Sequence, residues 1–280
     1  MGDTAILKIV ACYSTFNDAA VLEESLRSLI DLVDFVVVVD GAYPGARDPH
    51  DHSWDGTIDI VNKTARSKCT VIQCIQRMTE PQKRNLYLGF VQANFPDAWL
   101  FHLDADEILH DAEEDFEWLR SEEGTHYQVA RIFRNDSDRR EWYGSDLYTS
   151  LFERTRLHPR FYHGIQGLHY VENHWMLRDA AGDRVEQKYD NTRLRKAWLE
   201  HKQAARTRQS IHLKNFYNIY ERWKYEKTIR PLRSYVPFQL LKAVDKFLNR
   251  YDLHPQKYLD RIYGYTMGSR TRRYRAPSDS

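Results

Sequence analysis

The sequence has few cysteines and no long apolar run. Its three cysteines, Cys12, Cys69 and Cys74, cannot all pair, and they lack the spacing of a metal-binding motif. Cys12 and Cys74 lie within apolar runs, so we expect buried free thiols in a reducing compartment. Apolar runs such as residues 35–39 are far too short to span a bilayer. The N-terminal segment also lacks the features of a signal peptide, and the sequence therefore predicts a cytoplasmic protein.

A large excess of one charge is also absent, because the formal net charge is only +1 at neutral pH. This balance hides an asymmetry between two parts of the chain. Residues 222–275 carry 14 Lys and Arg against 4 Asp and Glu, whereas residues 1–221 carry 27 against 35. An acidic body followed by a basic C-terminal quarter suggests two regions with different tasks.

Short apolar runs alternate with stretches of helical periodicity in the first part of the chain. Runs rich in β-branched residues indicate buried strands, while apolar residues spaced three and four apart indicate amphipathic helices. Their alternation predicts an α/β fold with a mostly parallel sheet flanked by helices. The expected strands are 5–12, 35–39, 69–75 and 98–103, with later strands at 127–133 and around Phe161, and the expected helices are 19–32, 57–66 and 81–94.

The last third of the chain has a different pattern. From Leu194 onward the apolar residues recur at helical spacing, and Pro231 and Pro237 interrupt the pattern before a further amphipathic run. We therefore expect one α/β domain over residues 1–190 and a helical, basic region over residues 191–280.

Two carboxylates, Asp104 and Asp106, directly follow the apolar run at 98–103. Ligands of open α/β sheets bind beyond the carboxyl ends of the strands. Two other expected strands end in polar residues, at Asp40 and at the cluster 14–18, so we expect all three ends to converge on one crevice. Carboxylate oxygens suit Mg²⁺ or Mn²⁺, and an ion held there can bridge the phosphates of a nucleotide.

Each of these residues also has a plain structural interpretation. Asp104 and Asp106 would alternatively serve as acidic caps of a helix after Leu109, and Asp40 as a turn residue in an Asp-Gly pair. Arg84 stands at the start of an expected helix, where the helix dipole favours phosphate groups. Lys83 beside it is expected to be a solvated residue of the helix end.

Four segments of the chain, taken in order, form a recognisable series of motifs. They are Ser14-Thr15-Phe16-Asn17-Asp18, Asp40-Gly41 with Ser53-Trp54-Asp55-Gly56-Thr57, Arg84-Asn85 with Ala93, and Leu103-Asp104-Ala105-Asp106-Glu107-Ile108-Leu109. Together they resemble the motifs of family 2 glycosyltransferases of the GT-A fold. The resemblance covers roughly residues 5–110, with residues 42–52 as an insertion, and Phe16 stands where the family has Tyr.

The resemblance implies a glycosyltransferase with a GT-A domain, which the helical region expected from the apolar pattern would follow. Its donor would be a nucleotide-diphosphate-sugar, with a UDP-sugar favoured. Its cofactor would be a divalent ion, Mn²⁺ or Mg²⁺, and transfer would invert the anomeric carbon. Carried over by position, Thr15 and Phe16 would contact the base, Asp40 the base or ribose, Arg84 the phosphates, Asp104 the ribose and metal, and Asp106 the metal.

The second half of the chain resembles lipopolysaccharide-type members of this family more loosely, over residues 160–175. An inverting transferase needs a base that deprotonates the acceptor hydroxyl, and Glu172 is the candidate, followed by Asp146 and Glu153. His201 precedes a basic segment, as a late histidine does in these enzymes. Its imidazole would suit Mn²⁺ as a third ligand or would bond a phosphate oxygen.

Two other functions stay open. A nucleotidyltransferase can share this α/β layout and acidic metal site, but it would be expected to carry a Gly-rich, basic loop after the first strand. Residues 13–17 contain no glycine there. The other alternative is a catalytically inactive module that binds a nucleotide-sugar.

The acceptor is not specified by the sequence and could be a glycan, a lipid-linked sugar or a protein. Residues 237–251 carry an apolar stripe beside Lys242, Lys246 and Arg250. Such a helix would suit the surface of an anionic membrane, or it would pack on the α/β domain with its cations solvated. A nucleic-acid partner is not expected.

Overall fold

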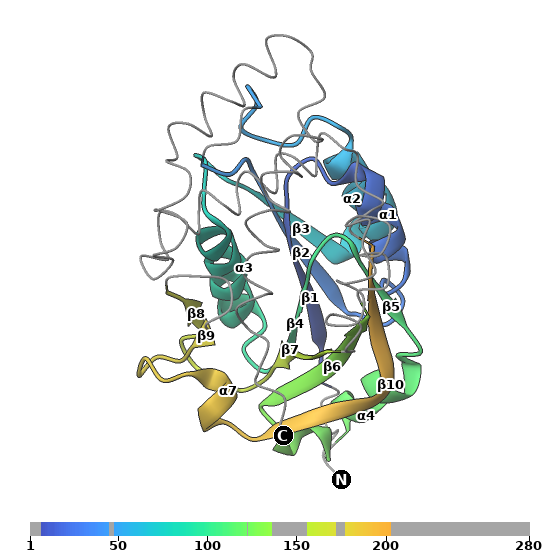
Figure 1. The fold of residues 1–280 in the computed structure, drawn as a ribbon, viewed down its shortest axis with the longest axis vertical. Coiled ribbons are helices and arrows are strands. Elements are labelled where there is room, and N and C mark those ends of the chain that lie inside the picture. The colour runs from blue at the N-terminus through green and yellow to red at the C-terminus, as the bar shows by residue number, and fades with distance from the viewer. Residues whose placement is uncertain (1–6, 45–47, 122, 136–155, 172–176, 203–280) are drawn as a thin grey trace, which may run out of the picture. The chain divides into compact units, whose positions relative to one another are not determined.

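The computed structural model describes residues 7–44, 48–121, 123–135, 156–171 and 177–202 (Figure 1). They form an eight-stranded sheet with the order β3-β2-β1-β4-β7-β6-β10-β5, and a two-stranded sheet of β8 and β9. The strands are β1 (Ile9–Thr15), β2 (Phe35–Asp40), β3 (Cys69–Gln73), β4 (Trp99–Leu103), β5 (Glu107–His110), β6 (Val129–Asn135), β7 (Arg156–Tyr162), β8 (His169–Tyr170), β9 (Leu177–Arg178) and β10 (Asn191–His201). The helices are α1 (Ala19–Arg27), α2 (Thr57–Ala65), α3 (Glu80–Asn94), α4 (Glu113–Arg120) and α7 (Val185–Lys188), with short 3₁₀ turns η1 (Arg66–Lys68) and η2 (Gly124–His126).

Strands β3, β2, β1 and β4 are parallel neighbours, and their side chains alternate between two buried cores. One core lies between one face of the sheet and helices α1, α2 and α4, and it includes Leu22 and Phe116. The other core lies between the opposite face and α3, and it includes Tyr87 and Leu88. Figure 1 shows α1 and α2 on the other side of the sheet from α3. The predicted α/β fold, with a mostly parallel sheet flanked by helices, is thereby confirmed, although the sheet also contains antiparallel pairs that involve β5 and β7.

The strands and helices expected up to residue 103 are confirmed in kind among the described residues, with shifts at their ends. β1 continues to Thr15 because its backbone pairs with β2 as far as Asp40. α1 ends at Arg27, a few residues before the expected end. α3 begins after a capping box in which Thr79 and Gln82 bond each other's backbone amides, which satisfies two otherwise unpaired donors.

The turn that carries Asp104 and Asp106 does not lead into a helix. Residues Glu107–His110 form strand β5, and the next helix, α4, begins only at Glu113. The interpretation of the two aspartates as helix caps is therefore wrong. They lie in the connection between β4 and β5 instead.

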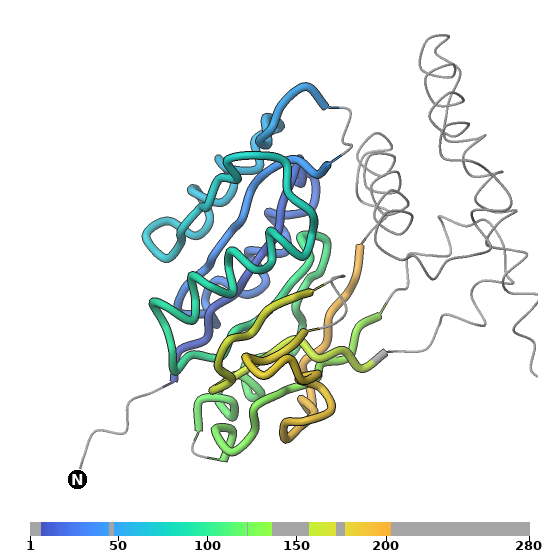
Figure 2. The backbone as a smooth tube through the Cα atoms, turned by 90° about the vertical axis from the view of Figure 1, so that its left-hand side faces the viewer, coloured from blue at the N-terminus to red at the C-terminus, as the bar shows by residue number. Residues whose placement is uncertain are grey.

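The helix expected from Leu194 is wrong as far as residue 201, because Asn191–His201 form β10. This strand lies between β6 and β5, parallel to the first and antiparallel to the second. In Figure 2 its orange segment runs beside the green segments that hold those strands. Its register with β6 shifts between Arg193 and Trp198. In a regular strand the buried residues are two positions apart, but across this irregularity the buried Leu194 and Ala197 are three positions apart. That spacing resembles the spacing of a helix.

The chain divides into two compact units, Met1–Leu213 and Lys214–Ser280, and all the described residues lie in the first. The first unit thus continues past the boundary expected at residue 190. The rest of the predicted helical, basic region lies outside the described residues. As expected, Cys12 and Cys74 are buried free thiols, while Cys69 is a half-buried one. No helix within the described segments is long and apolar enough to cross a bilayer.

Candidate active site

The carboxyl ends of β1, β2 and β4 lie side by side, as the strand-end pattern predicts. Parallel pairing places Thr15 next to Asp40, and Tyr13 next to Leu103 just before Asp104. The Thr15 hydroxyl lies 3.3 Å from Oδ1 of Asp40 and donates to it. The polar residues that follow the three strands therefore occupy one edge of the sheet.

Asp40 is fully buried rather than a surface turn residue. Its carboxylate accepts hydrogen bonds from the Ser53 backbone N–H (3.0 Å) and the Ser53 hydroxyl (2.5 Å), besides the one from Thr15. These bonds fasten the segment after the insertion onto the strand ends. The predicted contact of Asp40 with a base or ribose stays a prediction.

Thr15 and Phe16, the predicted base contacts, are also buried. The Phe16 ring packs edge-on against Tyr43, with 6.4 Å between the ring centroids. Asn17 follows in a left-handed conformation (φ 53°), and its side chain bonds both Asp48 and the backbone N–H of Trp54. The loop after β2 is thus tied down beside these residues, whose role toward a base stays a prediction.

Lys83 is fully buried, so the expectation of a solvated lysine at the helix end is wrong. Its ammonium donates to the backbone carbonyl of Thr15 at 2.6 Å and to that of Gly41 at 2.8 Å. It also lies 4.2 Å from the centroid of the Tyr43 ring, a cation–π distance. Burial lowers the pKa of Lys83 to about 8, because the charged form loses its hydration. Lys83 therefore clamps together the ends of β1 and β2 from α3.

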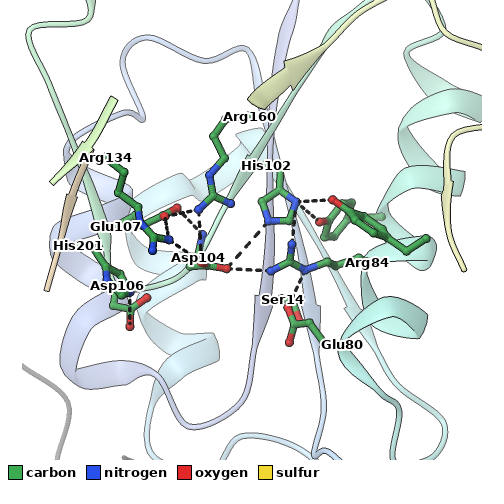
Figure 3. A network of polar contacts seen from close by, with 12 residues as sticks. Ser14, Glu80, Arg84, His102, Asp104, Asp106, Glu107, Arg134, Arg160 and His201 are labelled. Atoms are coloured by element: carbon green, nitrogen blue, oxygen red, sulfur yellow. Dashed lines mark hydrogen bonds and ion pairs between the residues drawn. The ribbon is translucent and has the colours of Figure 1, made fainter. Parts of the chain in front are cut away.

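Arg84 points to the same edge, but its donors are engaged within the protein (Figure 3). Its Nε donates to Glu80 at 2.8 Å, its Nη2 to Asp104 at 2.9 Å, and its Nη1 lies 3.3 Å from Nδ1 of His102. Burial works against the charge, yet Glu80 and other neighbours outweigh it, so the pKa of Arg84 lies above its ordinary value. These contacts use three of the five N–H donors of the guanidinium, and the predicted contact of Arg84 with phosphates stays a prediction.

Asp104 lies at the centre of a cluster of opposite charges (Figure 3). Besides Arg84, it lies 3.5 Å from Arg160 and 3.9 Å from Arg134. The buried Glu107 pairs with Arg134 at 3.2 Å and with Arg160, and it accepts the backbone N–H of Asp104 at 2.9 Å. The Asp104 side chain is 26% exposed, whereas that of Glu107 is 0% exposed. Asp104 is therefore the carboxylate of this cluster that a ligand can reach.

Asp106 and His201 form a second pair at the same edge. Oδ2 of Asp106 lies 3.5 Å from Nε2 of His201, and both side chains are buried. Antiparallel pairing of β5 with β10 sets His201 opposite Glu107, and the Lys202 backbone N–H donates to the Asp106 carbonyl. The sheet thus brings together two predicted metal ligands that lie 95 residues apart in sequence.

The pair offers one carboxylate oxygen and one imidazole nitrogen, which are two potential ligands for a divalent ion. In the described part of the chain no group of three or more His, Cys, Asp or Glu side chains is placed to hold a metal. Ions such as Mg²⁺ are commonly held by one or two carboxylates together with substrate phosphates and water. The role of Asp106 and His201 as metal ligands stays a prediction, and it needs further ligands from a substrate such as a diphosphate. Asp104 is balanced by three arginines and is less suited to be a ligand as it stands.

The remaining predicted site residues fall outside the described part of the chain. They are the candidate bases Glu172, Asp146 and Glu153, and the basic residues of the C-terminal region, Lys242, Lys246 and Arg250. Their assignments stay predictions.

Several members of the charge cluster were missed by sequence reasoning, although β6 held a signal for one of them. The period of two in β6 places Arg134 on the same buried face as Ala130 and Ile132. A cation on the core face of a strand needs a buried carboxylate partner, and Glu107 provides it. The burial of Lys83 and His102 had no such signal, because it depends on how α3 packs against the sheet.

No protein-family model matches the sequence, and no curated protein matches it. Among solved structures, TarS from S. aureus is similar with a TM-score of 0.37 and 22% identity, over 47% of this chain and 22% of that one. The mannosyltransferase PcManGT from Pyrobaculum calidifontis, solved with GDP-Man and Mn²⁺, is similar with a TM-score of 0.34 and 22% identity. That likeness covers 53% of this chain and 39% of the other.

A nucleotidyltransferase-type structure is also similar. It is assigned as a glucose-1-phosphate thymidylyltransferase from Bacillus anthracis and was solved with sucrose. Its TM-score is 0.32 at 8% identity, over 76% of this chain and 83% of that one. The chain spans less than half the length of the first two proteins. All three TM-scores lie below 0.5, so these likenesses carry no argument about function.

Proposed function

We propose that the chain is a metal-dependent glycosyltransferase of the GT-A type, which moves a sugar from a nucleotide-diphosphate-sugar to an acceptor hydroxyl with inversion. One observation carries the proposal. The Asp106–His201 pair and the arginine-bound Asp104 share the carboxyl edge of the sheet, beside the polar ends of β1 and β2. The ordered motifs over residues 5–110 support the same reading.

In this proposal the residues of the edge divide the work of holding the donor. Asp106 and His201 would hold a divalent ion, Mn²⁺ or Mg²⁺, which when bound supplies positive charge to a departing diphosphate. Arg84, Arg134 and Arg160 hold Asp104 in place and offset the negative charge of Asp104 and Glu107. Asp104 remains accessible, and its carboxylate would accept a hydrogen bond from a hydroxyl of the nucleotide-sugar.

The acceptor side of the reaction is proposed from the sequence only. A general base must remove the proton of the attacking hydroxyl, and Glu172 is the proposed group. Glycan, lipid-linked and protein hydroxyls are the three acceptor classes.

Nucleotide binding tests the proposal most directly. Thermal unfolding would be followed with UDP, GDP, TDP and CMP, each with and without Mn²⁺, and any nucleotide that stabilises the protein would then be tested as its sugar conjugate for hydrolysis and transfer. The proposal requires Mn²⁺-dependent stabilisation and release of a nucleoside diphosphate. Pyrophosphate release from a nucleoside triphosphate and a sugar phosphate would instead identify a nucleotidyltransferase. Binding without turnover would identify an inactive module.

The metal pair gives the first prediction. Asp106→Asn removes the ligand charge without removing volume, so we expect Mn²⁺-dependent nucleotide affinity to fall by about a hundredfold or more. Even the loss of a group behind a metal ligand lowers affinity by about 10–100-fold. Titration calorimetry with Mn²⁺ and the best nucleotide would measure this change. Asp59→Asn is the matched control, because that carboxylate is exposed on α2. Unchanged affinity in Asp106→Asn, or activity in excess EDTA, would refute the metal site.

A further inference from the structure

His102 lies on β4 with its side chain on the face of the sheet that α3 covers. Its neighbour Leu100 belongs to the core under α3, whereas Phe101 and Leu103 belong to the core on the other face. His102 is only 3% exposed and stands among Tyr87, Tyr170, Arg84 and Asp104. A buried imidazole in this position connects the core of the domain to the charged edge.

Three groups meet one ring nitrogen of His102 (Figure 3). Nδ1 lies 2.7 Å from the Tyr87 hydroxyl, 3.2 Å from the Tyr170 hydroxyl and 3.3 Å from Nη1 of Arg84. A tyrosine hydroxyl can donate or accept, but a guanidinium only donates. A proton on Nδ1 would therefore point at the N–H of Arg84, and only an Nδ1 lone pair makes this contact favourable.

The other ring nitrogen must then carry the proton of the neutral ring. Nε2 lies 4.0 Å from Oδ1 of Asp104, the carboxylate that Arg84 binds, which is an electrostatic contact rather than a hydrogen bond. The guanidinium of Arg84 is planar, and its three nitrogens contact Glu80, His102 and Asp104. The lone pair of Nδ1 therefore fixes the rotation of the guanidinium plane, and with it the direction of the hydrogen bond from Arg84 to Asp104.

We propose that His102 is a positioning residue of the site: as the neutral Nε2–H tautomer, it accepts from Arg84 and Tyr87 and so orients Arg84 on Asp104. The tautomer and the orientation of Arg84 belong to the protein alone. The consequence for nucleotide binding rests on the proposed function. These two parts can fail separately, so each has its own measurement.

The tautomer is tested on the full-length protein without any ligand. A long-range ¹H–¹⁵N spectrum separates protonated from unprotonated imidazole nitrogens, and the His102 signals are those that disappear in His102→Asn. We expect an unprotonated Nδ1 and a protonated Nε2. A protonated Nδ1, in the other neutral tautomer or in a charged ring, would overturn the proposal whatever the protein's activity.

Two substitutions distinguish the role of Nδ1 as a hydrogen-bond acceptor from the role of the ring in filling space. The side-chain oxygen of Asn can take the place of Nδ1, whereas the amide of Gln reaches the place of Nε2. Gln is also closer in volume to His. If His102 positions Arg84, His102→Asn retains more stability than His102→Gln, despite the larger cavity. If His102 only fills space, the order is reversed, because cavity volume then sets the loss. Chemical denaturation of both variants and of His102→Leu, which offers no acceptor, gives the order.

Nucleotide affinity supplies the last readout. With Mn²⁺ and UDP or GDP as the probe, we expect His102→Gln and His102→Leu to bind about tenfold or more weakly than wild type, a change of about 1.4 kcal/mol per tenfold. His102→Asn should lose less than either. Equal losses in all three variants would overturn the positioning role. If wild type binds none of the nucleotides, the proposed function fails, while the tautomer and the stability order still decide on His102.

Discussion

At the scale of single residues, Lys83 places its ammonium group at the ends of β1 and β2. It bonds two backbone carbonyls and lies over an aromatic ring, with no exposure to solvent. Its pKa of about 8, against an ordinary value of 10.5, follows from the loss of hydration. Between these two pH values the unfolded chain binds a proton that the folded chain has released. Raising the pH through this range therefore favours the folded state.

This linkage gives a prediction for Lys83→Met. The unfolding free energy of wild type minus that of the variant should rise between pH 8 and 10.5, by up to about 3 kcal/mol, since one pKa unit is about 1.4 kcal/mol. Urea denaturation at several pH values would measure the difference. Lys63→Met, on the exposed face of α2, is the control and should show no comparable rise. A flat difference for Lys83→Met would mean that the lysine is hydrated after all.

At the scale of elements, β10 depends on a single carboxylate from α4. Where its register shifts, the backbone N–H groups of Arg195, Lys196 and Ala197 all donate to Asp115, at 3.0, 2.7 and 2.7 Å. Asp115 is buried, and its two oxygens satisfy three donors that the strand ladder leaves free. β10 ends at His201, so this anchor also helps to hold one of the candidate metal ligands in place.

Asp115→Asn should therefore affect both stability and the distant site. An amide keeps one acceptor oxygen and turns an N–H₂ group toward backbone donors, so we expect a loss of about 2–3 kcal/mol of unfolding free energy. Mn²⁺ affinity should fall as well, because His201 is displaced with the strand. Denaturation and metal titration would measure the two effects. Glu114→Gln is the control: its ion pair with Lys196 is exposed, so its loss should stay below about 1 kcal/mol. Intact stability in Asp115→Asn would contradict this anchoring role.

At the scale of the whole molecule, the sheet is completed by a strand that comes late in the chain. β10 inserts between β6 and β5, and its buried Leu194, Ala197 and Leu199 contribute to the core that α1, α2 and α4 share. The compact unit that includes this strand extends to Leu213. A domain that stopped at residue 190 would leave β5 and β6 without their common neighbour and the core open.

Two truncations test this assignment. A chain that ends at residue 213 should unfold cooperatively, whereas a chain that ends at residue 190 should lack a cooperative transition, because it loses β10 and His201. Circular dichroism during heating would show the difference. If the shorter chain unfolds as cooperatively as the longer one, the strand is dispensable and the domain ends where the sequence pattern placed it. Failure of both chains would show that residues after 213 contribute to the first unit.

Much of the α/β layout and part of the site can be predicted from local patterns of apolar and polar residues in the sequence. Runs of β-branched residues such as 36–39 are buried on both faces, and this composition favours a central parallel strand over any alternative. Asp40, Asp104 and Asp106 follow such strands, so their meeting at one edge could be predicted from the topology of parallel sheets. By contrast, the spacing around Leu194 predicts a helix, because an irregular strand can imitate helical periodicity.

The sequence by itself determined the α/β class and the first strands and helices, since these depend on interactions between near neighbours. The edge where the acidic residues gather then followed from the topology that parallel sheets share. Only the tertiary structure decided which charges are paired. Lys83, Arg84 and Glu107 are polar residues that solvent would ordinarily hydrate, and their burial depends on partners from distant segments. The pairing of Asp106 with His201 needs the register of β10 on β5. Contacts of this kind are set by the packing of the whole sheet, which no local pattern contains.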